Sequence, residues 1–209
     1  MFNLILTDPK EELCVKWEQA FAQFPEVKIV NGYFEEIEKF DCMVSAANSF
    51  GLMDGGVDLA IIRFFGPELE KRVQRVIIEE YFGEQPVGTS FVIPVNNPQN
   101  QFVAHTPTMR VPMPINGTDN VYLAMKAMLE AVNRYNKENA SSPIQSVVCP
   151  GLGTATGRMP FIEAARQMSL AYKNFINPID ELNWQVAQSR HFEITYGGKM
   201  GYNFGRENN

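Results

Sequence analysis

The 209-residue sequence predicts a layered α/β fold with a mixed sheet that is parallel at its centre. Short apolar runs rich in β-branched and aromatic residues alternate with longer segments whose apolar residues recur every three to four positions. That alternation is the pattern of strands connected by amphipathic helices. Hydrophobic residues make up 45% of the chain and charged residues 20%, so a substantial core can be buried.

Cap and turn residues place the elements along the chain. Asp8-Pro9 signals a helix start, because aspartate caps helix N-termini and proline fits the first turn, and Pro25 ends that helix. Gly66-Pro67 should kink or divide the second helix. Turn-forming residues 96–100 are expected to join two β-rich runs into a hairpin. The predicted strands are residues 2–6, 27–30, 41–46, 89–95, 102–106 and 144–149, and the predicted helices are residues 9–24, 58–82, 119–137 and 160–176.

The C-terminal part of the chain is less regular. Its pattern predicts a short helix over residues 180–191 and a strand over residues 192–196, followed by a glycine-punctuated end that should fray. We therefore expect one domain over residues 1–177 and an appendage over residues 178–209 that packs on it.

Composition excludes several classes of protein. No apolar run reaches the length of a membrane span, and the N-terminus lacks a signal-peptide layout. The three cysteines are widely spaced, and two lie in strand-like runs, which indicates reduced thiols in a cytoplasmic protein. A net charge of −6 without a Lys/Arg cluster argues against broad nucleic-acid binding. The sequence has two histidines, His105 and His191, and no His-Glu pair at ligand spacing, so we expect no metal site and no cofactor.

Two glycine-containing loops follow strands at the positions where α/β sheets bind ligands. The first glycine loop runs from Asn48 to Asp58, and the second runs from Pro150 to Pro160. Glycine lets backbone approach a ligand closely, and the helix after each loop offers unpaired N–H groups and a positive dipole end. Two such loops side by side suit a diphosphate. The alternative is that the glycines only make tight turns.

The stretch from Val44 to Ile61, VSAANSFGLMDGGVDLAI, resembles the signature of the macro domain family, roughly V-N-A-A-N-x-x-L-x-G-G-G-V-D-x-A-I, and departs from it chiefly at Ser45 and Asp54. The second glycine loop, PGLGTATGRMP, is similar to a second family signature, roughly P-A-I-G-T-G-V-G-G-F-P. Residues 104–106 are similar to a family strand that reads I-H-T. The resemblance implies a three-layer α/β/α sandwich whose partner is ADP-ribose or an ADP-ribosylated macromolecule.

The resemblance also implies roles for particular residues. Asn48 would orient the distal ribose, and Asp58 would activate water or position the leaving group. The alternative for Asp58 is a structural role, as an acidic residue that stabilises the first turn of its helix. Arg158 stands where the family usually has glycine, and it is either a phosphate clamp or a surface residue. The expected ligand-binding set is Gly55, Gly56, Val57, Gly153, Thr154, Ala155, Thr156, Gly157 and Arg158.

Recognition of the base stays open at this point. In the family the second strand usually ends in Gly-Asp, and that aspartate accepts a hydrogen bond from the adenine amino group, whereas this chain has Gly32-Tyr33. Glu35 or Glu36 could take over that role, or Tyr33 or Phe34 could stack on the base. Three functions are compatible with the sequence. They are hydrolysis of ADP-ribosyl linkages or of ADP-ribose 1″-phosphate, non-catalytic ADP-ribose reading, and an interaction role for a degenerate pocket.

Overall fold

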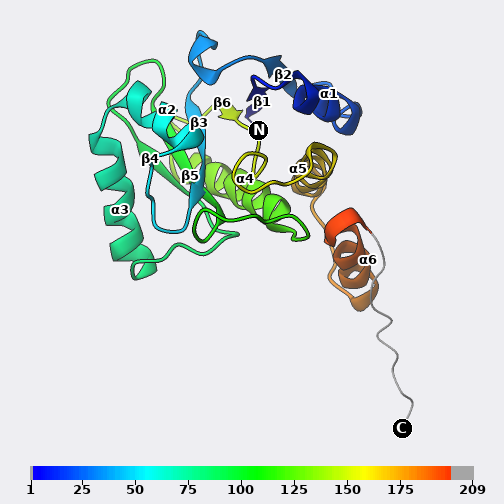
Figure 1. Ribbon diagram of the computed structural model, residues 1–209. Helices are drawn as coiled ribbons and strands as arrows, with labels where there is room; N and C mark the ends of the chain where they lie inside the picture. Colours follow the sequence, from blue (N-terminus) through cyan, green and yellow to red (C-terminus); the bar gives the residue numbers. More distant parts are fainter. Residues whose placement is uncertain (1, 199–209) are drawn as a thin grey trace.

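The computed structural model describes residues 2–198 and places a six-stranded sheet between two layers of helices (Figure 1). The strand order is β2-β1-β6-β3-β5-β4. All neighbouring strands are parallel except β4 and β5, which form the antiparallel hairpin that the sequence predicts. The mixed, centrally parallel sheet is therefore confirmed. The strands are β1 (Asn3–Asp8), β2 (Lys28–Asn31), β3 (Cys42–Asn48), β4 (Phe91–Pro94), β5 (Phe102–Met109) and β6 (Ser146–Cys149).

Two hydrophobic clusters, one on each face of the sheet, hold the three layers together. One cluster lies beneath α1 (Glu11–Ala20), α4 (Asn120–Glu138) and α5 (Phe161–Ile176). The other lies beneath α2 (Gly56–Phe65) and α3 (Glu68–Tyr81). Parallel strands covered on both faces read as apolar runs, and this explains the continuous hydrophobicity of the central strands. The α/β/α sandwich is thus confirmed.

Strand β3 shows how the two faces are filled. Its side chains alternate, so that Cys42 and Val44 join the cluster beneath α1, α4 and α5, while Met43 joins the cluster beneath α2 and α3. Ser45 has the same parity as Met43 and is fully buried. A hydroxyl group therefore lies on the α2 side of a strand whose other residues are apolar except for Asn48 at its end.

Helix boundaries follow the backbone signals except at the start of the first helix. The long second helix divides at Gly66, whose φ of 100° no other residue type adopts readily, and this matches the prediction. The first helix begins at Glu11 and not at Pro9, because the backbone of Lys10 is extended, with φ −88° and ψ 104°. The Asp8 carboxylate accepts a hydrogen bond from the Lys10 N–H before the helix starts.

The strand predicted over residues 192–196 is wrong. Helix α6 (Trp184–Ile194) continues through most of it and is followed by a 3-10 turn, η2 (Tyr196–Gly198). The Arg166 guanidinium of α5 donates to the carbonyl oxygens of Glu193 and Thr195, at 2.7 and 3.1 Å, and so satisfies carbonyl groups at the end of the helix. The expected frayed end, residues 199–209, lies outside the described residues.

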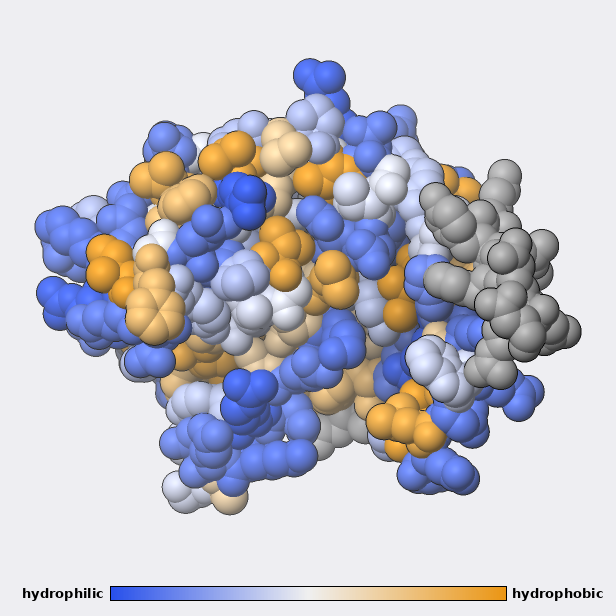
Figure 2. All heavy atoms as spheres, turned by 90° about the horizontal axis from the view of Figure 1, so that it is seen from below, coloured by the Kyte–Doolittle hydropathy of each residue, from blue (hydrophilic) through white to orange (hydrophobic). Residues whose placement is uncertain are grey.

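The face of the molecule seen from below is mostly polar (Figure 2). In the view from below, hydrophilic residues dominate and apolar residues form small groups between them (Figure 2). Across residues 2–198, no helix combines the length and the hydrophobicity needed to cross a bilayer.

Candidate functional site

A cavity of about 560 Å3 opens where the carboxyl ends of the parallel strands meet. This volume suits a small organic ligand. Both glycine loops form its wall, so segments about a hundred residues apart in the sequence lie side by side, as predicted. Of the expected ligand-binding set, every residue except Arg158 lines the cavity. The wall contains Gly55, Gly56, Val57, Gly153, Thr154, Ala155, Thr156 and Gly157, together with Asn48 and Asp58.

The first glycine loop leaves backbone groups open toward the cavity. Gly55 is extended and Gly56 has a φ of +57°, and a Cβ atom added at either position would meet no atom within 4 Å. No side chain caps the N-terminus of α2, whose first turn begins at Gly56. Uncapped N–H groups at a helix start attract anions, and here they border an open space.

The second glycine loop owes its glycines to close packing. A Cβ atom at Gly157 would lie 2.4 Å from the carbonyl oxygen of Gly153, and one at Gly153 would lie 2.6 Å from the Ile115 side chain. The Ile115 N–H also donates to the Gly157 carbonyl at 2.7 Å. Close packing therefore accounts for Gly153 and Gly157, and the left-handed backbone accounts for Gly56, whereas neither constraint applies to Gly55.

Asn48 uses its side chain to shape its own loop. Its Nδ2 donates to the Leu52 carbonyl at 2.7 Å, and its Oδ1 accepts from the N–H groups of Phe50 and Leu52 at 3.0 and 3.3 Å. Asn48 also lines the cavity. A ligand hydroxyl at this position would therefore compete with, or share, the bonds that hold the loop.

Asp58 is a buried acid at the cavity wall. It is the third residue of α2, it is 6% exposed, and its Oδ1 accepts a hydrogen bond from Ser45 Oγ at 2.7 Å. Burial raises the pKa of Asp58 to about 6, the Ser45 hydroxyl acts in the opposite direction, and nearby Asp54 adds to the increase. A carboxyl group that titrates near neutral pH can take a proton during a reaction.

The loop after β1 and the turn after β2 also line the cavity. Tyr33 is 58% exposed and lines the cavity together with Glu35. Phe34 also reaches the wall, but it is buried against Phe64 in the core. The Glu36 carboxylate accepts from the Tyr33 N–H at 3.1 Å, so it caps its own turn.

Asp8 is a site residue that the sequence pattern does not single out, because the pattern accounts for its side chain as a helix cap. Asp8 ends β1 beside Asn31 at the end of β2, and it lines the cavity next to the Tyr33 turn. The available signal was its place at the carboxyl end of a parallel strand, where such sheets bind ligands.

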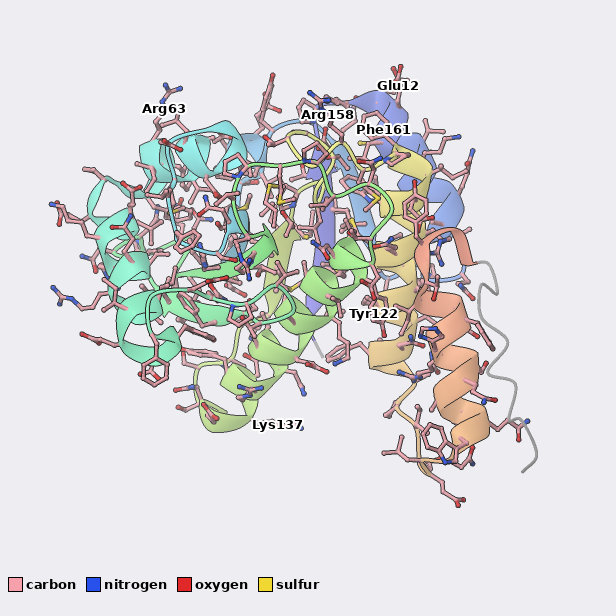
Figure 3. All side chains as sticks on the ribbon, turned by 60° about the horizontal axis from the view of Figure 1, so that its bottom comes forward. Glu12, Arg63, Tyr122, Lys137, Arg158 and Phe161 are labelled. Carbon is pink, nitrogen blue, oxygen red and sulfur yellow. The ribbon has the colours of Figure 1, made fainter. Side chains whose placement is uncertain are left out.

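Two further candidate residues lie apart from the cavity. Arg158 is exposed, has a left-handed φ of 50°, and lies on the second glycine loop near Phe161 at the start of α5 (Figure 3). His105 is buried, its Nδ1 lies 2.6 Å from Gln85 Oε1, and burial lowers its pKa to about 3. His105 is thus a neutral core residue. No group of three or more potential metal ligands occurs within residues 2–198.

Comparisons with known proteins agree with the fold and the loops. The family model described as Macro domain matches residues 44–168, which is more than half of the chain. An uncharacterised protein of Aquifex aeolicus is 32% identical over 151 residues, which cover 72% of this chain and 82% of that protein.

Solved structures of the Oceanobacillus iheyensis macrodomain are similar to this one. A glycine-to-valine variant with ADPR is 27% identical, covers 68% of this chain and 74% of that chain, and has a TM-score of 0.57. The same macrodomain with ADP is 27% identical, covers 68% and 73%, and has a TM-score of 0.55. With this match to the family model and to the Aquifex relative, the chain belongs to the macro domain family.

Proposed function

We propose that the cavity binds ADP-ribose and that the protein hydrolyses an ADP-ribosyl linkage, either on a modified side chain or in ADP-ribose 1″-phosphate. The observation that carries the binding half is the single cavity walled by both glycine loops, with open backbone at Gly55 and Gly56. The similar macrodomain that was solved with ADPR and with ADP supports the same ligand.

The pyrophosphate would lie between the two loops. Uncapped N–H groups at the start of α2 supply donors and a positive dipole end without needing a cationic side chain. This suits an acidic protein, since a net charge of −6 does not prevent a local site for an anion. Arg158 would contribute only if its exposed side chain turned toward the ligand.

The base would occupy the part of the cavity lined by Asp8, Tyr33 and Glu35. The exposed ring of Tyr33 offers a stacking surface, and the two carboxylates offer acceptors for an exocyclic amino group. This arrangement supports adenine as the base even though the chain lacks an aspartate directly after Gly32.

Asp58 would act as the general base. A water molecule held beside the distal ribose would attack its anomeric carbon as the bond to the leaving oxygen breaks. Asp58 would accept the proton of that water, and the carboxylate or phosphate would depart as an anion. The position of Asp58 on the cavity wall and its pKa of about 6 support this role.

One observation favours non-catalytic reading as the second candidate. The side chain of Asn48 already makes three hydrogen bonds within its own loop, which leaves little capacity to orient a ribose for attack. A protein that binds ADP-ribose without hydrolysing it would need the cavity, but it would not need an Asn48 side chain that is free to bond the ribose.

Two measurements separate these functions. Titration calorimetry with ADP-ribose tests binding, and a turnover assay on ADP-ribosylated protein and on ADP-ribose 1″-phosphate tests catalysis. We expect Asp58→Ala to abolish turnover while its ADP-ribose affinity stays within about tenfold of the wild-type value. Binding of ADP-ribose without turnover of any such substrate would favour the non-catalytic function, and the absence of binding would refute the proposal.

A further inference from the structure

We propose that Ser45 is a positioning residue, whose hydroxyl group holds one oxygen of the Asp58 carboxylate and leaves the other available to a water molecule in the cavity. This inference rests on the proposed role of Asp58, and it concerns a residue at which the chain departs from the family signature.

The geometry separates Ser45 from the ligand and joins it to Asp58. Ser45 lies in the middle of β3, is fully buried, and is absent from the cavity wall, whereas Asp58 lines that wall. The 2.7 Å bond from Ser45 Oγ to Asp58 Oδ1 links the sheet to the first turn of α2. A buried hydroxyl is costly unless it is paired, so this bond is the reason that a serine is tolerated here.

Other groups around Asp58 do not supply a cation. Asp54 on the first glycine loop is acidic, and so is Glu70 of α3, whose carboxylate accepts from the Met53 N–H at 2.9 Å. His105 of β5 is the register partner of Ser45, but burial lowers its pKa to about 3 and keeps it neutral.

The nearby basic side chains are also engaged or directed elsewhere. Arg63 on α2 points into solvent (Figure 3), and the ammonium group of Lys10, which also lines the cavity, lies 5.4 Å from the centre of the Phe161 ring. Within residues 2–198, the Ser45 hydroxyl is therefore the side-chain group that donates to the Asp58 carboxylate.

Removing the Ser45 hydroxyl would change the proton affinity of Asp58 more than it would change the fold. A carboxylate that loses its donor in a buried site favours the protonated form, because burial penalises charge. A protonated Asp58 cannot accept a proton from water. In Ser45→Ala we expect the pKa of Asp58 to rise from about 6. Turnover should then fall by about tenfold for each pH unit of that rise when it is measured well below pH 6, but only by about twofold at pH 7 for a rise of one pH unit.

The test is a carbon-detected NMR titration of the Asp58 carboxyl group in the ligand-free protein, compared among wild type, Ser45→Ala and Ser45→Thr. We expect Ser45→Ala to move the midpoint upward by about one pH unit, and Ser45→Thr, which keeps a hydroxyl, to restore it. The control is Ser49→Ala, which removes another buried serine hydroxyl, one that lies 3.5 Å from the Met109 carbonyl oxygen. That variant should leave the midpoint unchanged.

The outcome does not depend on finding the substrate. An unchanged midpoint in folded Ser45→Ala, or equal midpoints in Ser45→Ala and Ser45→Thr, would overturn the inference. If the midpoint moves as expected and no ligand or turnover is found, Ser45 still controls the carboxyl group and the proposed function fails separately. If turnover is found, the acid limb of its pH profile should move with the NMR midpoint while KM stays constant.

Discussion

Replacing Asp58 with asparagine should stabilise the protein at neutral pH and not at acid pH. The side chain of asparagine has nearly the same shape, and its carbonyl oxygen can still accept the hydrogen bond from Ser45. What the substitution removes is a charge held in a site that is 6% exposed. The prediction follows from the pKa of Asp58, which burial raises from 3.8 to about 6.

The sign and size of the effect follow from proton linkage. Well below pH 3.8 the carboxyl group is protonated in both the folded and the unfolded chain, so it costs the fold nothing. As the pH rises toward 6, the unfolded chain loses its proton first and is stabilised relative to the folded protein. Above pH 6 the cost is complete, and the difference between 3.8 and about 6, at about 1.4 kcal/mol per pH unit, amounts to about 3 kcal/mol. This difference already contains the favourable interaction of the charge with the start of α2, so the expected net gain is about 2–3 kcal/mol.

Urea denaturation of wild type and Asp58→Asn across pH 4.5 to 8 measures this difference directly. The free energy of unfolding of the variant should exceed that of wild type by about 2–3 kcal/mol at pH 8 and converge with it toward the acid end. Asp180→Asn, a change at an exposed aspartate after α5, is the control and should stay within about 0.5 kcal/mol of wild type throughout. A difference for Asp58→Asn that does not vary with pH, or a loss of stability at pH 8, would refute the reasoning.

Three other predictions test the loops and the C-terminal helix. Gly157→Ala should destabilise the fold by about 1–3 kcal/mol, because the new Cβ atom would lie 2.4 Å from the carbonyl oxygen of Gly153. Gly55→Ala, where a Cβ atom meets nothing within 4 Å, should stay within about 0.5 kcal/mol of wild type. Equal losses of stability in urea denaturation would contradict the packing difference between the two loops. Arg158→Gly should raise the free energy of unfolding by about 1 kcal/mol, because Arg158 has a left-handed φ of 50°, and a lower melting temperature would show that its side chain stabilises the loop. Arg166→Ala should speed amide hydrogen exchange in α6 and leave exchange in α2 unchanged, because Arg166 donates to the carbonyl groups of Glu193 and Thr195 at the end of α6. Unchanged exchange in α6 would show that other contacts stabilise this helix.

Alternating patterns made the sheet and most helices predictable from the sequence. Apolar runs marked the central strands, and Gly66-Pro67 marked the division between α2 and α3, since both signals depend on neighbouring residues alone. The strand expected over residues 192–196 failed because local β-propensity was outweighed at both ends of α6. Asn183 caps the helix by accepting from the Val186 N–H, and Arg166 satisfies carbonyl groups at the other end from a distant part of the chain.

The candidate site was predictable in outline but not in its internal bonds. The two glycine loops could be placed together because parallel strands end at one edge of the sheet. The inclusion of Asp8 could not be derived locally, since it depends on β1 lying beside β2. The pairing of Ser45 with Asp58 depends on the way α2 packs on β3, and the commitment of Asn48 to its own loop depends on the path of residues 48–52.

The central claim is that the two glycine loops, from different parts of the chain, bind one pyrophosphate between them. A crystal structure of the protein grown with ADP-ribose tests this most directly. We predict that the pyrophosphate lies between Gly55-Gly56 and residues 153–157, with the distal ribose toward Asp58 and the base toward Tyr33. ADP-ribose bound at another surface, or a cavity that stays empty at saturating ligand, would contradict it.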